Sequence, residues 1–174
     1  MNWYVLFVRT GQEHRVERFL KVRLEDDMYA PFVPLHEMFL KTSGVVKKVV
    51  KPLFPGYVFI ESDAPCQELL ERTNTFAYTL SDVVRILKYS DREFAMRESE
   101  KQMLLSLCNQ DYCIESSGGI IEGDRIHIMH GPLRGRESIV RKIDRHKRKA
   151  WIEMEFMGDR RLVGVALEIV ARVG

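Results

Sequence analysis

The sequence is poor in the residues that form disulfides, metal sites and membrane spans. It contains three cysteines, Cys66, Cys108 and Cys113, whose odd number and irregular spacing fit neither a disulfide framework nor a set of metal ligands. No uninterrupted run of about 18 apolar residues occurs, which excludes a transmembrane helix. The apolar stretch near the N-terminus is short and is followed by charged residues, which excludes a secretory signal. We therefore expect a cytoplasmic protein with chemically inert thiols.

The chain has enough apolar sequence for one or two cores. Its 174 residues are 45% hydrophobic and 30% charged, as in globular proteins of one or two domains. The charge is unevenly divided. Residues 120–174 carry 12 Lys and Arg against 8 Asp and Glu, a net of +4, whereas residues 1–119 carry 15 against 17, a net of −2. The positive field therefore lies at the C-terminal end.

Strands alternate with helices over residues 1–107. The aromatic and β-branched run WYVLFV predicts a buried strand over 3–8. A helix is expected over 13–26, where apolar residues recur at helical spacing. The further expected elements are a β-hairpin that turns near Ser43 and Gly44, strands over 57–61 and 83–87, and helices over 64–74 and 98–108. This alternation predicts an N-terminal α/β sandwich.

The rest of the chain predicts a linker and a second domain. Residues 108–119 are polar, lack periodicity and end in Ser-Ser-Gly-Gly, which predicts a flexible linker. Closely spaced strand candidates follow, and the alternation of apolar and polar residues over 149–156 is typical of a half-buried strand. Residues 120–174 should therefore form a small β-barrel. The expected fold class is α+β, with the sandwich over 1–107, the linker over 108–119 and the barrel over 120–174.

Cations are concentrated in the stretch VRKIDRHKRKAWIEMEF. Asp144 to Lys149 should connect two strands, which would place several cations at one exposed tip. Clustered cations repel one another, whereas a phosphate backbone would neutralise them and release counterions. The candidate RNA-binding residues are Arg134, Arg136, Arg141, Lys142, Arg145, His146, Lys147, Arg148, Lys149 and Trp151. The alternatives are a solvated turn, and a tryptophan that lies over a neighbouring strand instead of stacking on bases.

No catalytic or nucleotide-binding motif is visible. GPLRG at 131–135 lacks the Gly-Lys-Ser/Thr ending of a phosphate-binding loop. His127 and His130 are three apart in an expected strand, so they would point to opposite faces and could not easily share a metal. We therefore expect no enzymatic activity, no cofactor and no bound metal.

Three segments carry a resemblance to a known family. WYVLFVRTGQEHRVERFL, KPLFPGYVFI and EGDRIHIMHGPLRGRESIVRKID occur in this order, with EMEFMG following, and together they resemble the NusG family of transcription elongation factors. The first two look like its N-terminal NGN domain and the third like its C-terminal KOW domain, which has an SH3-like barrel. The resemblance covers nearly the whole chain.

The resemblance implies that the NGN domain docks on RNA polymerase, at the clamp helices of the largest subunit. Matched by motif, the polymerase-binding residues would be Phe7, Phe54, Pro55, Gly56, Tyr57 and Phe59. Aromatic side chains suit this role because they bring large contact area with little loss of rotamer entropy. The alternative is that these aromatics fill the core, since strand alternation sends some of them inward.

Departures from the family pattern suggest a specialised member. Ser138 stands where the family usually has glycine, and the following loop is unusually basic, so the chain looks like a paralogue of the LoaP kind. The resemblance then implies an antitermination factor whose KOW domain binds nascent RNA, such as a leader hairpin, and promotes readthrough of terminators. The alternative is a general elongation factor whose KOW domain binds a ribosomal protein or a termination helicase.

The expected partners follow from the same resemblance. RNA polymerase and a nascent RNA hairpin are the main ones, and we expect a monomer without a membrane partner. DNA of the transcription bubble is a further candidate partner for a second basic group, which comprises Arg9, Lys41, Lys47, Lys48 and Lys51. Lysines on a protruding hairpin are as often explained by solubility.

Overall fold

The chain folds into two compact units in the computed structural model, which describes residues 1–24, 27–76 and 80–174. Unit 1 comprises residues 1–34 and 54–101, and unit 2 comprises residues 35–53 and 102–174. Helices and strands occur together, which confirms the expected α+β class. The expected helix over 13–26 is observed as α1 (Glu13–Arg23), and its last two positions lie outside the described residues.

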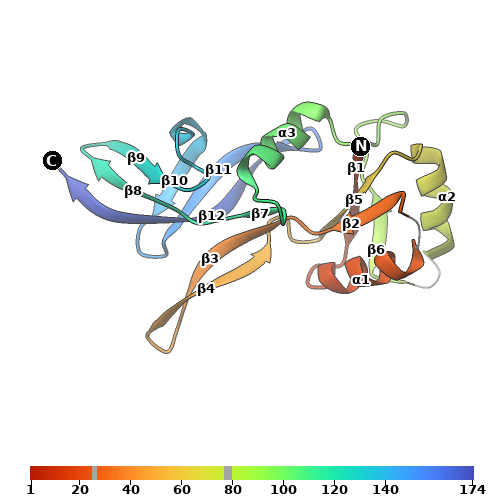
Figure 1. The fold of residues 1–174 in the computed structure, drawn as a ribbon, viewed down its shortest axis with the longest axis horizontal. Coiled ribbons are helices and arrows are strands. Elements are labelled where there is room, and N and C mark those ends of the chain that lie inside the picture. Colours follow the sequence, from red (N-terminus) through yellow and green to blue (C-terminus); the bar gives the residue numbers. More distant parts are fainter. Residues whose placement is uncertain (25–26, 77–79) are drawn as a thin grey trace. The chain divides into compact units, whose positions relative to one another are not determined.

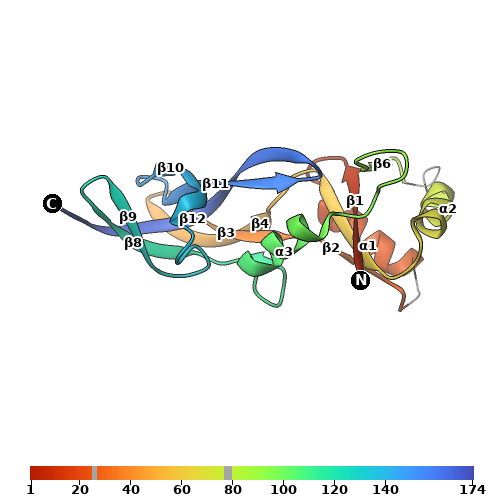
Figure 2. The same ribbon diagram turned by 90° about the horizontal axis from the view of Figure 1, so that it is seen from above.

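Unit 1 is built on a four-stranded sheet of order β2-β5-β1-β6. The strands are β1 (Asn2–Val8), β2 (Tyr29–Phe32), β5 (Tyr57–Ser62) and β6 (Val83–Ile86), and the helices are α1 and α2 (Cys66–Phe76). Neighbouring strands run antiparallel, and Figures 1 and 2 show β1 within the sheet.

The sheet of unit 1 is buried on both faces. Trp3 and Val5 point to one face of β1, and Tyr4 and Leu6 to the other, yet all four are at most 2% exposed. Val16 and Leu20 of α1, Leu24 directly after it, and Leu69 of α2 are also buried. A strand buried on both faces reads as a continuous apolar run, which is why WYVLFV was recognisable from sequence.

The N-terminal part of unit 2 is a β-hairpin. Strands β3 (Leu35–Thr42) and β4 (Val45–Pro52) pair antiparallel through a two-residue turn at Ser43 and Gly44. Both turn residues have positive φ, 51° and 79°, as the turn that suits the strand twist of a two-residue hairpin requires. The expected turn position is confirmed. The short strand β7 (Cys113–Ile114) pairs in parallel with the start of β3.

The C-terminal part of unit 2 is a five-stranded sheet of order β10-β11-β12-β8-β9. Its strands are β8 (Ser117–Glu122), β9 (Arg125–His130), β10 (Val140–Asp144), β11 (Lys149–Phe156) and β12 (Asp159–Val173). A single turn of 3-10 helix, η1 (Glu137–Ile139), precedes β10, and α3 (Glu98–Leu107) contains the division between the two units. Ala150, Ile152, Met154 and Phe156 of β11 are all buried, which confirms the alternation expected for this strand.

Strand β12 holds the sheet of unit 2 together. Its first half pairs antiparallel with β11, and its second half, from Leu167 onward, pairs in parallel with β8. The register shifts between Ile169 and Ala171, as at a β-bulge that bends a strand. Strand β12 is therefore a single bent element of 15 residues.

The segment expected as a linker contains regular structure. Residues 108–119 include β7 and the first residues of β8. A Cβ at Gly118 would lie 2.2 Å from the His130 ring, and one at Gly119 would lie 2.4 Å from the backbone oxygen of His127. The two glycines thus allow β8 and β9 to approach closely, which differs from the flexibility that the sequence suggested. The division into domains at residues 107 and 120 stays a prediction, and the compact units place the hairpin β3–β4 with the C-terminal residues.

Candidate functional site

Two aromatic side chains lie side by side near one end of the unit 1 sheet. Phe7 of β1 and Tyr57 of β5 are directly paired across the strands, and their ring centroids are 5.5 Å apart. Both residues are half-buried. The guanidinium of Arg85 lies 5.8 Å from the Phe7 centroid, within range of a cation–π contact. We call Phe7 and Tyr57 the aromatic pair.

The two other aromatics expected on this surface fill the core instead. Phe54 is 4% exposed and Phe59 is fully buried, and their rings stack with centroids 6.1 Å apart. Phe59 lies on the sheet face that also carries Trp3, whose ring is 5.9 Å away. Burial therefore favours the alternative for Phe54 and Phe59, that they fill the core, because their surface is already used in packing.

The turn between these aromatics is fixed by a carboxylate that the sequence did not reveal. Gly56 is buried with φ +91°, and its N–H donates to Glu13 Oε1 over 2.8 Å. The Gly11 N–H donates to the same carboxylate over 3.0 Å, and Glu13 is 4% exposed. Burial raises the pKa of Glu13, but these backbone hydrogen bonds outweigh burial and lower the pKa below its usual value. Pro55 remains exposed at the turn.

The cationic stretch of unit 2 forms the turn between β10 and β11, as expected. Asp144 Oδ1 accepts a hydrogen bond from the Lys147 backbone N–H over 3.0 Å, which lowers the pKa of Asp144. The Arg148 N–H donates to the Arg145 oxygen over 3.3 Å, and Arg148 has φ 51°. We call residues 145–149 the basic tip. These hydrogen bonds fix the backbone conformation of the tip, so the cationic side chains project from an ordered turn.

The side chains of the basic tip differ in how far they are engaged. Arg145, His146 and Lys147 are exposed, and among the described residues neither Arg145 nor Lys147 forms an ion pair. The Arg148 guanidinium pairs with Glu168 over 3.2 Å. Arg145 and Lys147 are thus the tip cations most available to an anionic partner.

Trp151 does not present an open ring. It is half-buried, and the ammonium groups of Lys142 and Lys149 lie 4.9 and 4.8 Å from its ring. The Lys149 side chain crosses over Gly164, since a Cβ at Gly164 would come within 2.3 Å of its Cε. The ring is therefore flanked by two cations, which does not favour its use as a free stacking platform.

The three further arginines expected at this site differ in how far their guanidinium groups already have partners within the protein. Arg141 pairs with Glu153 over 2.6 Å and donates to the Ser138 oxygen over 2.7 Å. Arg136 contacts the Met103 sulfur over 3.4 Å. Arg134 is exposed in the turn after β9. Arg141 and Arg136 are mainly engaged within unit 2.

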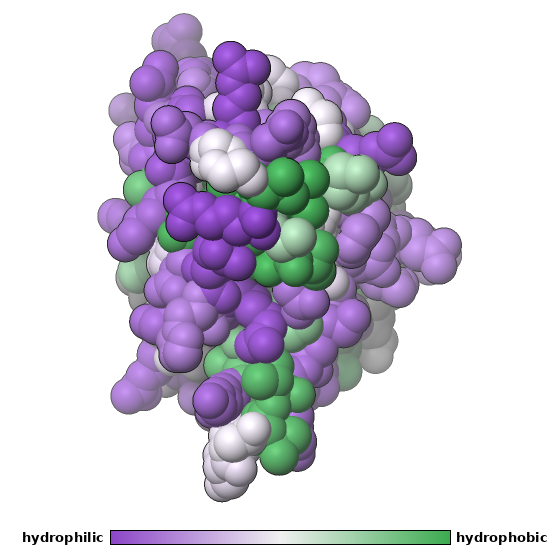
Figure 3. Space-filling view, turned by 90° about the vertical axis from the view of Figure 1, so that its left-hand side faces the viewer, coloured by the Kyte–Doolittle hydropathy of each residue, from purple (hydrophilic) through white to green (hydrophobic). Residues whose placement is uncertain are grey.

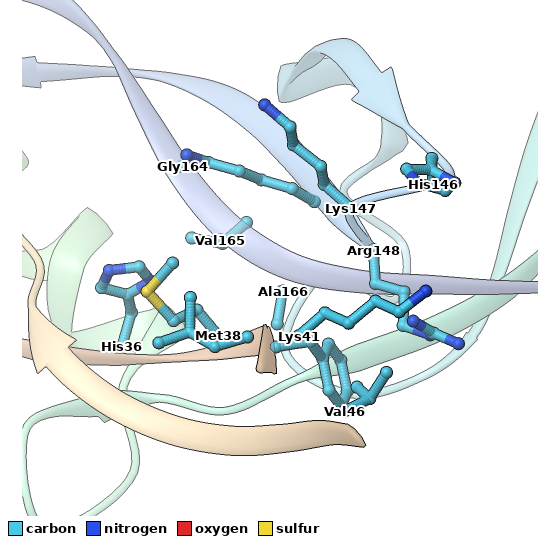
Figure 4. Close-up of a pocket in the computed structure, with 13 residues that line it drawn as sticks. His36, Met38, Lys41, Val46, His146, Lys147, Arg148, Gly164, Val165 and Ala166 are labelled. Carbon is cyan, nitrogen blue, oxygen red and sulfur yellow. The ribbon is translucent and has the colours of Figure 1, made fainter. Parts of the chain in front are cut away.

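A hollow of about 480 Å³ adjoins the basic tip and was not foreseen from the sequence (Figure 4). In this view His36 and Met38 lie at one end, and the cationic groups of Lys41 and Arg148 at the other. The hollow is lined by residues of β3 and β4, the basic tip and β12: His36, Met38, Phe39, Leu40, Lys41, Val46, His146, Lys147, Arg148, Lys149, Gly164, Val165 and Ala166. It combines an apolar wall with a cationic rim.

The second basic group is divided between the two units. Lys41, Lys47, Lys48 and Lys51 lie on the hairpin β3–β4, whereas Arg9 follows β1 in unit 1. On β4 the lysines are interspersed with exposed valines, and Val45 and Val46 are 55% and 39% exposed. Figure 3 shows a mainly hydrophilic face with hydrophobic residues gathered in small areas. Lysines on an edge strand also protect it from pairing with other chains.

The structure gives no sign of a metal centre in its described part. Within residues 1–24, 27–76 and 80–174, no group of three or more His, Cys, Asp or Glu side chains is placed to hold a metal ion. None of the helices described there has the length and apolar character needed to span a membrane. The three cysteines are free thiols, and burial raises the pKa of Cys108 to about 12.

Comparison with known proteins gives consistent matches. The family model described as "Transcription termination factor nusG" matches residues 1–105. The transcription termination/antitermination protein NusG of Thermus thermophilus is 23% identical over 167 residues, which cover 91% of each chain. The NusG protein of Streptococcus pyogenes is 24% identical over 158 residues, covering 88% of this chain and 87% of that one. A solved structure titled "Domain interaction in Thermotoga maritima NusG" has a TM-score of 0.55 at 19% identity, covering 97% and 93% of the two chains.

Proposed function

The chain belongs to the NusG family of transcription termination and antitermination proteins, and from this premise we propose that it binds RNA polymerase with unit 1 and nascent RNA with unit 2. In this proposal it is a specialised paralogue that promotes readthrough of terminators. It acts in the cytoplasm, as a binding protein without catalytic chemistry.

The contact with polymerase is assigned to the aromatic pair. Phe7 and Tyr57 are half-buried, directly paired and next to the exposed Pro55. Large aromatic rings with part of their surface open are typical anchors of protein interfaces. The carboxylate of Glu13 supports this assignment, because it holds the Gly56 turn from which Tyr57 projects. The contact area is therefore presented by a rigid element.

The contact with RNA is assigned to the basic tip, and one observation carries this assignment. Arg145 and Lys147 are exposed on one four-residue turn and form no ion pair among the described residues. Adjacent like charges without partners destabilise a fold slightly, whereas a phosphate backbone would neutralise both. Arg148 adds a guanidinium that the Glu168 carboxylate already positions. The competing function is a general elongation factor whose unit 2 binds a protein.

Two variants of the full chain test the RNA contact. Arg145→Ala combined with Lys147→Ala should weaken binding to a panel of hairpin RNAs and reduce the salt dependence of log K by about 2, roughly one per lost phosphate contact. Arg125→Ala combined with Arg172→Ala is the matched control, since it removes the same charge from exposed positions outside the tip. An equal loss of RNA affinity in both double variants would mean that only the net charge of the protein matters, and not the position of the tip cations. An absence of RNA affinity in the unmodified chain would favour the protein partner.

A third variant separates the two contacts. Tyr57→Ala should abolish terminator readthrough in transcription with purified polymerase while leaving RNA affinity unchanged. Phe19→Ala removes another half-buried aromatic ring of unit 1, one that lies on α1, and should leave readthrough intact. Readthrough that survives Tyr57→Ala would mean that the aromatic pair is not the polymerase contact.

A further inference from the structure

The hollow beside the basic tip continues into a second one. A neighbouring hollow of about 410 Å³ shares four lining residues with the first, namely Lys41, Val46, His146 and Arg148. Each volume lies within the range of pockets that hold small molecules, roughly 300–1,000 Å³. The two hollows form a continuous groove, all of whose lining residues belong to unit 2. We call it the tip groove.

Two open strand edges border the tip groove. Beyond His36, no described strand pairs with β3 on the side opposite β4. On β12, residues 164–166 pair with β11, and pairing with β8 begins only at Leu167. Side chains from both faces of β3 therefore reach the groove along this free edge. Such edges also leave backbone donors and acceptors without strand partners.

The lining of the groove matches a nucleotide better than a purely apolar ligand. Met38, Val46 and Val165 supply an apolar wall, and the half-buried ring of Phe39 also lines the groove. Lysine and arginine side chains of the rim come from both the hairpin and the tip. A nucleotide has this same division, since its flat base stacks on aromatic and apolar groups while its phosphate requires cations.

One polar atom in the wall lacks a partner. His36 is 8% exposed and lines the groove, yet its Nδ1 makes no hydrogen bond within the part of the chain that the structure describes. Burial lowers the pKa of His36, which keeps the imidazole neutral. An unsatisfied buried nitrogen costs free energy, and the edge of a base carries the donors and acceptors that would satisfy it.

We propose that the tip groove holds an unpaired nucleotide of the bound RNA, with its base against Phe39 and its phosphate between Lys41 and Arg148. This inference rests on the proposed RNA contact and deepens it. A base within a duplex has both faces stacked and its edge paired, so only a loop, bulge or single strand offers the free ring that the groove accepts. The basic tip then supplies affinity for the phosphate backbone, and the groove selects RNA that contains unpaired nucleotides.

The test uses the full chain with two probes, an oligouridine strand and a blunt RNA duplex with the same number of phosphates. Val46→Glu places a carboxylate where both hollows meet, on an exposed position of β4. Val50→Glu is the matched control, because it makes the same change on the same strand at a 53% exposed valine outside the groove. We expect Val46→Glu to weaken oligouridine binding about tenfold relative to Val50→Glu, and both to bind the duplex alike. Phe39→Leu should weaken oligouridine binding by about as much through lost stacking.

Four outcomes would overturn the inference, and they can be told apart. In the first outcome, the unmodified chain binds strand and duplex with equal affinity, and Val46→Glu binds the strand as tightly as Val50→Glu does. The basic tip would then still bind RNA, but the groove would take no part in that contact. No binding of either probe would refute the RNA contact itself. Competition by free uridine monophosphate at the affinity of the strand would assign the groove to a free nucleotide. Loss of readthrough in Val46→Glu with RNA binding intact would assign it to a protein segment.

Discussion

Replacing Glu13 by glutamine should destabilise unit 1 measurably, although the side chain keeps its shape. The carboxylate accepts hydrogen bonds from the Gly11 and Gly56 N–H groups and is almost completely buried. Hydrogen bonds to a charged acceptor contribute about 1.5–3 kcal/mol each, against about 1 kcal/mol for neutral partners. Two bonds that become neutral should therefore lower the free energy of unfolding by about 1–4 kcal/mol at neutral pH.

The pH dependence of this loss has a defined sign. Because folding lowers the pKa of Glu13 below its ordinary value of 4.5, the folded state stabilises the charged form. That stabilisation is complete above the unfolded-state pKa and disappears as the pH falls through the folded-state pKa. The difference between the unmodified chain and Glu13→Gln should thus be largest at neutral pH and shrink in acid.

The assay is urea unfolding followed by tryptophan fluorescence. Trp151→Phe in both proteins leaves Trp3, fully buried in unit 1, as the reporter. Glu17→Gln is the matched control on α1, since its contacts to His14 and Lys21 are 3.8 Å long and such ion pairs contribute about 0–1 kcal/mol. If Glu13→Gln costs no more than Glu17→Gln, or if its cost persists unchanged at about pH 3, the carboxylate does not hold the turn.

Two further expectations concern the turn and the thiols. Gly56→Ala should lower the free energy of unfolding by about 1–2 kcal/mol in the same assay, because Gly56 has a positive φ. A steric clash should add to this loss, since the new Cβ would lie 3.2 Å from Thr10 Oγ1. Gly11→Ala is the comparison, since it shares the positive φ and no described atom lies within 4 Å of its Cβ; equal costs would exclude the clash. Cys108, whose pKa is raised to about 12, should react with iodoacetamide at mildly alkaline pH only after unfolding, because its thiolate fraction is roughly a thousandfold below that of an unperturbed thiol. Rapid alkylation in the folded chain would contradict the raised pKa of this half-buried thiol.

Sequence patterns predicted the elements whose signals are local. The apolar run of β1, the Ser43 and Gly44 turn, and the alternation along β11 each lie within a few residues, and all three were recognised. The tip was placed correctly for the same reason, since Asp144 and the cations after it are consecutive. The identification of β8 failed because Gly118 and Gly119 suggest flexibility until the strand that packs against them is known.

The candidate sites were harder to predict because they depend on distant residues. Phe54 and Phe59 belong to the same sequence motif as Tyr57. Only the packing of Phe59 against Trp3 and Phe54 shows that these two rings are internal. Glu13 and Gly56 are 43 positions apart, so no spacing rule links them. The tip groove joins β3 to β12, more than 100 residues along the chain, and nothing in either segment alone indicates a hollow.

The dual pairing of β12 affects how unit 2 is made. Before β12 is synthesised, β8–β9 and β10–β11 are two separate hairpins, and isolated hairpins are marginally stable in water. Residues 159–173 then join both hairpins at once, through one parallel and one antiparallel edge. During translation the basic tip should therefore become ordered late and in a single cooperative step, and until then the nascent chain exposes two unpaired strand edges that chaperones or other chains can capture.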